Sequence, residues 1–390
     1  MSACDSAGPS GNQPVLNKIV AGSGSTCALT DEGLAYCWGQ LFDEETASDP
    51  TCEAATGTRC RTRPDTLAFG MRFRDLRLAA NIFGHTICGI TTESRGYCWG
   101  TLSSGEDAGL VIGSVPQPLG AALPLQSISV ASHHFCAIST SGVTQCWGDY
   151  SGGARGTGQP LLQYVPADLS PNAVAGGLAF TDLGLGFASS CGLLTGAAYC
   201  WGWEVTVGST GASLSAAVEC GWDIAPVLGR CSHVPVPVAG EHTFATLAAG
   251  QNHACGLTDS GEVYCWGSNE SGQLGAQSST SGAPVRAAVP EGVQAVAVGS
   301  EFTCALGVSG LAYCWGLTHV GQSGSRSSLS PLPVPTPVAG GVRYRGIAAG
   351  HTHVCALRVS GGVDCWGSND RGELGTGDRA NSDVPRPVQF

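Results

Sequence analysis

One three-residue motif, Cys-Trp-Gly, recurs through the whole chain and constrains its fold more than any other feature. Each copy is preceded by a second cysteine nine or ten residues before the cysteine of the motif. The tryptophans of the seven copies are Trp38, Trp99, Trp147, Trp201, Trp266, Trp315 and Trp366. A repeat of about 50 residues is typical of a β-propeller in which each repeat forms one blade. The sequence therefore predicts an all-β protein, a seven-bladed β-propeller, although 390 residues would otherwise suggest several domains.

Each repeat is predicted to contain a β-hairpin. In residues 246–267, a short apolar strand and a Gly turn precede two strands joined by a three-residue loop that ends in Gly, a favoured hairpin connection. Pairing outward from that loop places Cys255 opposite Cys265. The fourth repeat is one residue shorter, yet the same pairing places Cys191 opposite Cys200. A register that survives a change in loop length supports the hairpin interpretation.

The chain has 19 cysteines, and their positions in these hairpins predict disulfides. Opposed residues on antiparallel strands are close enough to be joined after a small adjustment. The alternative is metal binding, but no Cys-x-x-Cys occurs and each repeat offers two thiols, so we expect no metal site. The predicted hairpin pairs are Cys27–Cys37, Cys88–Cys98, Cys136–Cys146, Cys191–Cys200, Cys255–Cys265, Cys304–Cys314 and Cys355–Cys365.

Four further cysteines lie in the two longest insertions, residues 40–66 and 202–238. We expect Cys52 to pair with Cys60 and Cys220 with Cys231. Disulfides of this number belong to an oxidising compartment, so the predicted location is extracellular, periplasmic or at the cell surface.

Two repeats resemble a known family closely: GQNHACGLTDSGEVYCWGSNESGQLG (250–275) and GHTHVCALRVSGGVDCWGSNDRGELG (350–375). They resemble the regulator-of-chromosome-condensation repeat, and the resemblance extends over residues 17–390, with a disulfide-rich secreted bacterial type as the expectation. The other five repeats keep Trp-Gly and are expected to lose most of the family pattern after that dipeptide. The resemblance implies a propeller but does not choose a function, because members of this family act as exchange factors, ligase modules and inhibitors. An oxidising compartment argues against the nuclear exchange-factor role.

The two ends of the chain suggest how the ring closes. Residues 18–22 correspond to the second strand of a blade, whereas residues 385–390 match the Pro-rich segments at 235–238 and 335–338, which we interpret as first strands. We therefore predict that the C-terminal strand completes the first blade and so removes an exposed sheet edge.

Residues 1–16 are predicted to be a flexible leader. Cys4 follows Ser2-Ala3, which resembles the end of a bacterial lipoprotein signal, so one interpretation is that Cys4 carries a lipid and holds the protein at a membrane. The alternative is a stray or intermolecular thiol.

Composition and motifs argue against catalysis and nucleic-acid binding. A formal net charge of −12 does not supply the basic stripe that nucleic acid requires. No nucleophile elbow, phosphate loop or zinc-protease motif occurs, so we expect neither an enzyme nor a cofactor. His134, His253 and His353 each stand two residues before a hairpin cysteine. The family resemblance implies a structural histidine that bonds within its blade; the alternative is an incomplete ring of metal ligands.

Binding is the better-supported function. Both long insertions come directly after Cys-Trp-Gly, and equivalent loops emerge on one face of a propeller. Aromatic residues are enriched in interface hot spots. The candidate binding residues are Phe42, Asp43, Glu44, Glu45, Trp203, Glu204, Trp222 and Asp223. We expect a protein partner. One alternative is a glycan ligand, with calcium held by the acidic residues of the first insertion. The others are self-association into a surface structure, and loops that only cover the face of the propeller.

Overall fold

A computed structural model of the chain describes residues 14–40, 59–67, 69–79, 85–104, 107–119, 124–148, 153–159, 168–203, 218–222, 225–277 and 281–390, together with Ser48 and Pro50. These residues form seven antiparallel sheets, and each sheet is one blade. Six of the sheets have four strands and one has five. No helix in the described ranges is long and apolar enough to cross a membrane.

The strands follow one another around the molecule in chain order. Blade 1 contains β1 (Leu16–Ala21), β2 (Ser25–Thr30), β3 (Ala35–Gln40) and β4 (Cys60–Thr66). Blade 2 contains β5 (Phe73–Leu78), β6 (His85–Thr91), β7 (Gly96–Ser104) and β8 (Asp107–Pro118). Blade 3 contains β9 (Leu125–Val130), β10 (His134–Ser139), β11 (Thr144–Gly148) and β12 (Asp168–Ala173). Blade 4 contains β13 (Asp182–Leu185), β14 (Ser189–Leu194), β15 (Ala197–Trp203), β16 (Val218–Trp222) and β17 (Ala225–Pro237), after the short 3-10 turn η2 (Ala175–Gly177). Blade 5 contains β18 (Phe244–Ala249), β19 (His253–Thr258), β20 (Val263–Gly267) and β21 (Ser281–Arg286). Blade 6 contains β22 (Val293–Val298), β23 (Phe302–Gly307), β24 (Ala312–Gly316) and β25 (Leu332–Pro337). Blade 7 contains β26 (Tyr344–Ala349), β27 (His353–Arg358), β28 (Val363–Gly367) and β29 (Ser382–Pro387).

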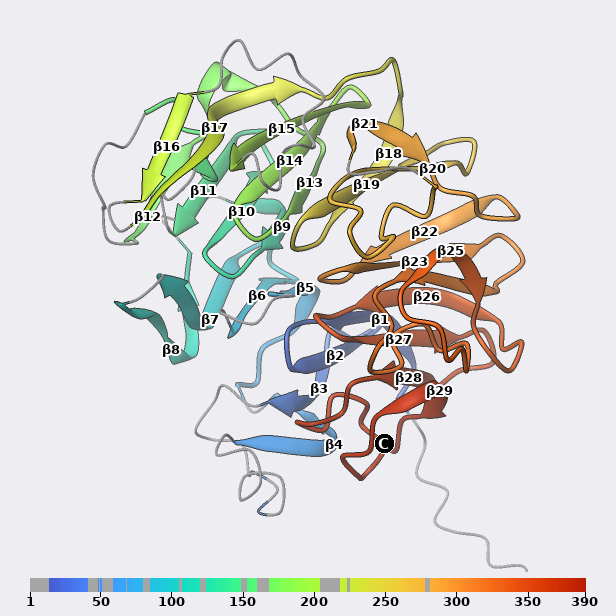
Figure 1. The fold of residues 1–390 in the computed structure, drawn as a ribbon. Coiled ribbons are helices and arrows are strands. Elements are labelled where there is room, and N and C mark those ends of the chain that lie inside the picture. Colours follow the sequence, from blue (N-terminus) through green and yellow to red (C-terminus); the bar gives the residue numbers. More distant parts are fainter. Residues whose placement is uncertain are drawn as a thin grey trace, which may run out of the picture.

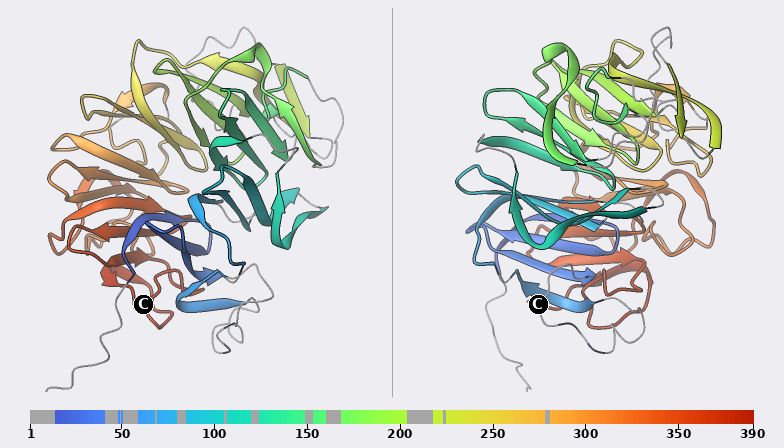
Figure 2. Two further views of the ribbon diagram at one scale, coloured as in Figure 1. Left: turned by 180° about the vertical axis from the view of Figure 1, so that it is seen from behind. Right: turned by 90° about the vertical axis from the view of Figure 1, so that its left-hand side faces the viewer.

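The blades are arranged around a central axis, and the first blade lies beside the last (Figures 1 and 2). The first strand of each blade is innermost, and the Pro-rich strand is outermost in most blades. One face of the ring carries the turns between first and second strands and the connections between third and fourth strands; we call it the loop face. The opposite face carries the tips of the hairpins between second and third strands, and we call it the hairpin face.

The ring closes differently from the sequence prediction, and that prediction was wrong. The C-terminal strand β29 pairs with β28 in blade 7, and blade 1 is completed by its own β4. The error came from treating the Pro-rich segment as the first strand of the next blade, whereas it is the last strand of its own blade.

Side-chain packing, instead of a shared sheet, joins the two ends of the chain. Ile19 and Trp38 of blade 1 belong to one buried cluster with Leu357 and Val388 of blade 7. The ring of Phe390, the last residue, lies edge-on to Trp38 with 6.1 Å between ring centroids. The first and last blades therefore bury apolar surface against each other as neighbouring blades do elsewhere in the ring.

The hydrophobic core lies between blades. All seven repeat tryptophans are buried. Each packs with residues of an adjacent blade; for example, Trp366 of blade 7 shares a cluster with Phe302 and Leu306 of blade 6. Because no blade buries both of its faces alone, the ring is stable only as a whole.

The predicted hairpin register is confirmed in all seven blades. Cys255 lies opposite Cys265, and Cys191 opposite Cys200 in the shortened repeat. The seven disulfides join cysteines whose Cα atoms are 4.0–4.1 Å apart. Cys60 and Cys231 are also disulfide-bonded. Cys52 and the side chain of Cys220, their predicted partners, lie outside the described part of the chain, as does Cys4.

Candidate binding surface

Among the connections that the structure describes, four have a compact Gly-x-x-Gly loop between the third and fourth strands, on the loop face. In each, the N–H of the second glycine donates to the carbonyl of the first at 2.9–3.1 Å. The four compact loops are Gly153–Gly156, Gly272–Gly275, Gly321–Gly324 and Gly372–Gly375. Two of them, GARG and GQSG, belong to repeats that were expected to lose the pattern after Trp-Gly, so that expectation was wrong for blades 3 and 6.

Each compact loop bonds to the tryptophan of the next blade. Trp315 Nε1 donates to the carbonyl of Gln273 at 2.9 Å, and Trp38 Nε1 donates to the carbonyl of Glu373 at 2.7 Å. The loops of blades 3 and 6 receive Trp201 and Trp366 in the same way. The second glycine is required because a β-carbon there would lie 2.6–2.9 Å from the indole nitrogen.

At three of these contacts a histidine extends the chain of hydrogen bonds. His253 Nε2 is 2.8 Å from Thr303 Oγ1, and that hydroxyl donates to the carbonyl of Gln273 at 2.9 Å. His134 contacts Ser190 and His353 contacts Thr26 at the same distance. A hydroxyl that donates its one proton to a carbonyl must accept from the histidine, so Nε2 carries a hydrogen.

The predicted role of these histidines was therefore wrong in one respect: the bond crosses to the next blade instead of staying within its own. Burial lowers the pKa of each of the three rings to about 3. The burial disfavours the charged form because Nδ1 is enclosed without a hydrogen-bond partner. The alternative role, a metal-binding ring, finds no support in the part of the chain described, where no group of metal-binding side chains occurs.

The partner position obeys one rule around the ring. The position concerned is the residue directly before the first hairpin cysteine of each blade. A blade that has the histidine is followed by a blade with a hydroxyl residue at this position. A blade that lacks the histidine is followed by a blade with an apolar residue there. The hydroxyl residues are Thr26, Ser190 and Thr303, and the apolar ones are Ile87, Phe135, Ala254 and Val354. Blade order is thus encoded in pairs of residues across the interfaces.

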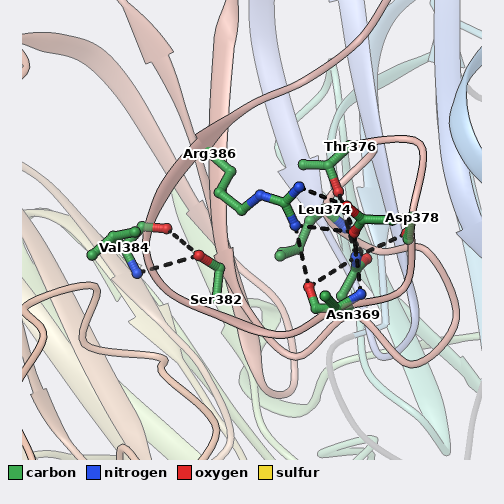
Figure 3. A network of polar contacts seen from close by, with 8 residues as sticks. Asn369, Leu374, Thr376, Asp378, Ser382, Val384 and Arg386 are labelled. Atoms are coloured by element: carbon green, nitrogen blue, oxygen red, sulfur yellow. Dashed lines mark hydrogen bonds and ion pairs between the residues drawn. The ribbon is translucent and has the colours of Figure 1, made fainter.

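The compact loop of blade 7 is held by a polar network (Figure 3). Asn369 accepts the Leu374 N–H at 2.9 Å and donates to the carbonyl of Asp378 at 2.9 Å. Arg386 bonds both oxygens of Asp378 and is the first cause of the lowering of the Asp378 pKa to about 2. Asn269 accepts the Leu274 N–H in the equivalent loop of blade 5. These asparagines hold the turns of their loops through hydrogen bonds to the backbone.

Blades 2 and 4 replace the compact loop with extended strands on the same face. In blade 2, β7 and β8 continue as a hairpin as far as the pair Ser104–Asp107. In blade 4, β16 adds a fifth strand at the outer edge of the sheet. The corresponding connection of blade 1 lies outside the described residues.

These extensions leave a gap in the hydrogen bonding of the following blades. Trp147 and Trp266, in the blades after 2 and 4, are buried, and Nε1 of each has no hydrogen-bond partner among the described residues. A buried donor without a partner costs about 1–3 kcal/mol. Since local rules are broken mainly at functional sites, the loop face of blades 2 and 4 is where we expect a function.

The residues proposed from sequence are placed only in part. β3 ends at Gln40 and β15 at Trp203, and both residues bond to the turn before their second strand, through Gln40 N to Gly24 O and Trp203 N to Ala188 O. The two insertions therefore leave from the loop face. Trp203 is half-buried, and Trp222 ends β16, but its side chain is not described. The candidates that lie outside the described residues are Phe42, Asp43, Glu44, Glu45, Glu204 and Asp223.

The geometry defines a class: a seven-bladed β-propeller with a disulfide in the hairpin of every blade. The family described as "Regulator of chromosome condensation (RCC1) repeat" matches residues 17–40, 244–273, 293–322 and 344–373 with one form of the repeat, and 260–306 and 360–390 with another. These segments of the chain are RCC1 repeats, and the fold that holds them is a seven-bladed β-propeller.

Similar proteins agree with this assignment. The Ultraviolet-B receptor UVR8 of Arabidopsis thaliana is 37% identical over 169 residues, which cover 41% of this chain and 28% of the receptor. This chain thus aligns with little more than a quarter of that relative. Human WBSCR16 has the same fold with a TM-score of 0.71 and 17% identity, covering 85% of this chain and 86% of that one. Prp20p of Saccharomyces cerevisiae, whose structure was described with its binding to Gsp1p and histones, has a TM-score of 0.69 and 17% identity, covering 86% and 80%.

Proposed function

We propose that this protein is a binding scaffold that works in an oxidising compartment and holds a protein partner on the loop face, around blades 1, 2 and 4. The observation that carries the proposal is the loss of the tryptophan hydrogen bond at Trp147 and Trp266, next to the two extended connections. At Trp38, Trp201, Trp315 and Trp366 a compact loop supplies that bond, so the extensions are retained at a cost in stability.

The disulfides support the proposed compartment. Their sulfurs are enclosed, with all fourteen hairpin cysteines no more than 7% exposed, which suits a structural role and not a redox role. Structural disulfides persist where thiols are not kept reduced. An extracellular or cell-surface location is part of the proposal, and attachment through a lipid on Cys4 remains a separate prediction.

The relatives support protein binding in general terms. Prp20p has the same fold and binds other proteins, but at 17% identity it shares only the fold with this chain. Nothing about its partners carries over, and we propose no exchange-factor activity.

The test is site-specific photo-crosslinking on the oxidised, full-length protein. A photoreactive residue at Trp203 or Trp222 probes the loop face, and one at Val308 or Val359 probes the hairpin face, where both valines are exposed. We expect a protein adduct from the loop-face positions alone, and we expect Trp222→Ala to abolish it. Equal adducts from both faces, or none from the loop face, would refute the proposed surface.

The two other functions expected from sequence are separated by experiments on the same protein. A glycan-array signal that a chelator removes would indicate a carbohydrate ligand at the acidic insertion. A mass that rises with concentration in sedimentation would indicate self-association. Either result without a loop-face protein adduct would replace the protein-binding proposal.

A further inference from the structure

The innermost strands carry an unusual distribution of charge. They hold four cations and two carboxylates, although the whole chain has a net charge of −12. The cations are Lys18, Arg74, Arg77 and Arg345, and the carboxylates are Asp75 and Asp182. All four cations belong to the neighbouring blades 7, 1 and 2. The inner strands β9, β18 and β22 have no charged side chain.

Two of these cations share a single carboxylate oxygen. Lys18 Nζ forms an ion pair with Asp75 Oδ1, and Arg77 Nη1 lies 3.3 Å from the same oxygen. In the part of the chain described, neither cation has another hydrogen bond or ion pair. An ammonium has three donors and a guanidinium five, so most of their N–H groups are unused.

Asp182, the other inner carboxylate, is already satisfied. Its Oδ1 accepts the Leu183 N–H and its Oδ2 accepts the Leu247 N–H, both at 2.9 Å. Arg74 is likewise occupied, because its guanidinium bonds the carbonyls of Leu125 and Gln126 in blade 3. Arg345 bonds the carbonyl of Leu16 in blade 1. Within the described residues, Lys18 and Arg77 are therefore the two inner cations whose contacts go only to Asp75.

The surroundings raise the positive potential at this position. Burial and the nearby charges of Arg77 and Arg74 lower the pKa of Lys18, and Asp75 only partly offsets them. The side chains remain reachable, with 31% of Lys18 and 38% of Arg77 exposed. An anion placed here would relieve the repulsion among the cations.

We propose that the axis of the propeller contains an oxyanion site in which Lys18 and Arg77 bind a carboxylate or phosphate group beside Asp75. A planar guanidinium next to an ammonium matches the oxygens of such groups. The oxygens can come from a small anion or from an acidic segment of a polypeptide. The site lies on β1 and β5, apart from the loop-face extensions, so it does not depend on the proposed protein partner.

The test is titration calorimetry of the full chain with inorganic phosphate, citrate, hexaglutamate and, as a control, hexalysine. We expect binding of at least one anionic probe and none of hexalysine. Binding of phosphate or citrate alone would assign a small-anion site, and preferential binding of hexaglutamate would assign a peptide site. Absence of binding by all three anions would overturn the proposal.

Variants locate the site. Arg77→Gln is expected to weaken binding about tenfold or more, since it removes a charge-assisted donor. Asp75→Asn is expected to strengthen binding, because it removes the competing carboxylate, and this gain is not expected of a merely structural residue. The matched control is Arg286→Gln, an exposed arginine paired with Glu262 on the outer part of blade 5. If Arg77→Gln does not fold, Arg77→Lys and Lys18→Gln replace it. Binding that survives both Lys18→Gln and either Arg77 variant unchanged would overturn the proposal.

Discussion

His353 of blade 7 lies 2.8 Å from Thr26 of blade 1, with the imidazole Nε2 donating to the hydroxyl Oγ1. The two residues are 327 positions apart in the chain, and their contact lies at the seam between its first and last blades. The same pair occurs at two other interfaces, so the seam is closed by the ordinary interblade contact and needs no shared strand. Ring closure therefore relies on matched side chains, together with backbone hydrogen bonds such as that from the His351 N–H to the Gly22 carbonyl.

Replacing one member of such a pair should cost more stability than replacing both members. Thr303→Val leaves the Nε2 hydrogen of His253 buried without an acceptor, and we expect a loss of about 1–3 kcal/mol of stability. The double variant His253→Phe/Thr303→Val copies the natural Phe302/Val354 interface and should recover much of that loss. Urea unfolding of the four members of the cycle measures the coupling. Additive losses would mean that the two side chains do not act as a pair.

Acid should destabilise the ring through the same histidines. Their folded pKa of about 3 lies below the ordinary value of 6.5, so the unfolded chain binds more protons between these values. The stability is present above pH 6.5 and is lost as the pH falls toward 3, by about 1.4 kcal/mol per pH unit for each histidine that differs fully. In His353→Phe/Thr26→Val, the slope of unfolding free energy between pH 5.5 and 4 should fall by that amount. An unchanged slope would show that His353 is not neutral when folded.

Glu373 should have the opposite pH dependence. Burial is the first cause that raises its pKa to about 7, so the folded protein prefers the protonated acid. Stability is highest below the unfolded pKa of 4.5 and is lost as the pH rises through 7. Glu373→Gln should stabilise the protein at pH 8 by roughly 1–3 kcal/mol and change little at pH 4. Gln273 and Gln322 already occupy this position in the equivalent loops, where each side-chain oxygen accepts a backbone N–H. A thermal shift that is equal at both pH values would contradict this account.

The second glycine of the compact loop should be intolerant of any side chain. Gly275 has a φ of 68°, and a β-carbon there would lie 2.6 Å from Trp315 Nε1. Gly341 has a φ of 61° with nothing within 4 Å, so Gly341→Ala isolates the backbone cost of about 1–2 kcal/mol. Gly275→Ala should cost roughly 1–3 kcal/mol more, because the indole must move. Chemical denaturation compares the two variants, and equal losses would show that the tryptophan contact contributes nothing.

The hairpins were predictable because their register is local. The pairing of Cys191 with Cys200 depends on one two-residue loop and needs no knowledge of the rest of the fold. By contrast, the assignment of the Pro-rich strands depends on which neighbour shares a sheet. Residues 385–390 have the same pattern whether they begin one blade or end another, so the sequence left this open.

The interblade contacts were harder to predict because they join backbone to side chains of another repeat. The carbonyl of Ala154 in the loop GARG receives Trp201, although its side chain has nothing in common with Gln273. The pairing of His134 in blade 3 with Ser190 in blade 4 can be found in the sequence, but only after the order of the blades is known. The proposed binding residues depend on loop conformation, which repeat periodicity does not determine.

The central claim is that the fold is stabilised by disulfides in an oxidising compartment. Its most direct test is the intact mass of the protein from its native source, with thiols blocked before any reduction. The account predicts nine disulfides, in which the seven hairpin pairs of the structure and those of Cys60 and Cys231 are all oxidised. Blocked thiols at the hairpin cysteines, or zinc retained in the native spectrum, would contradict it and place the protein in a reducing compartment.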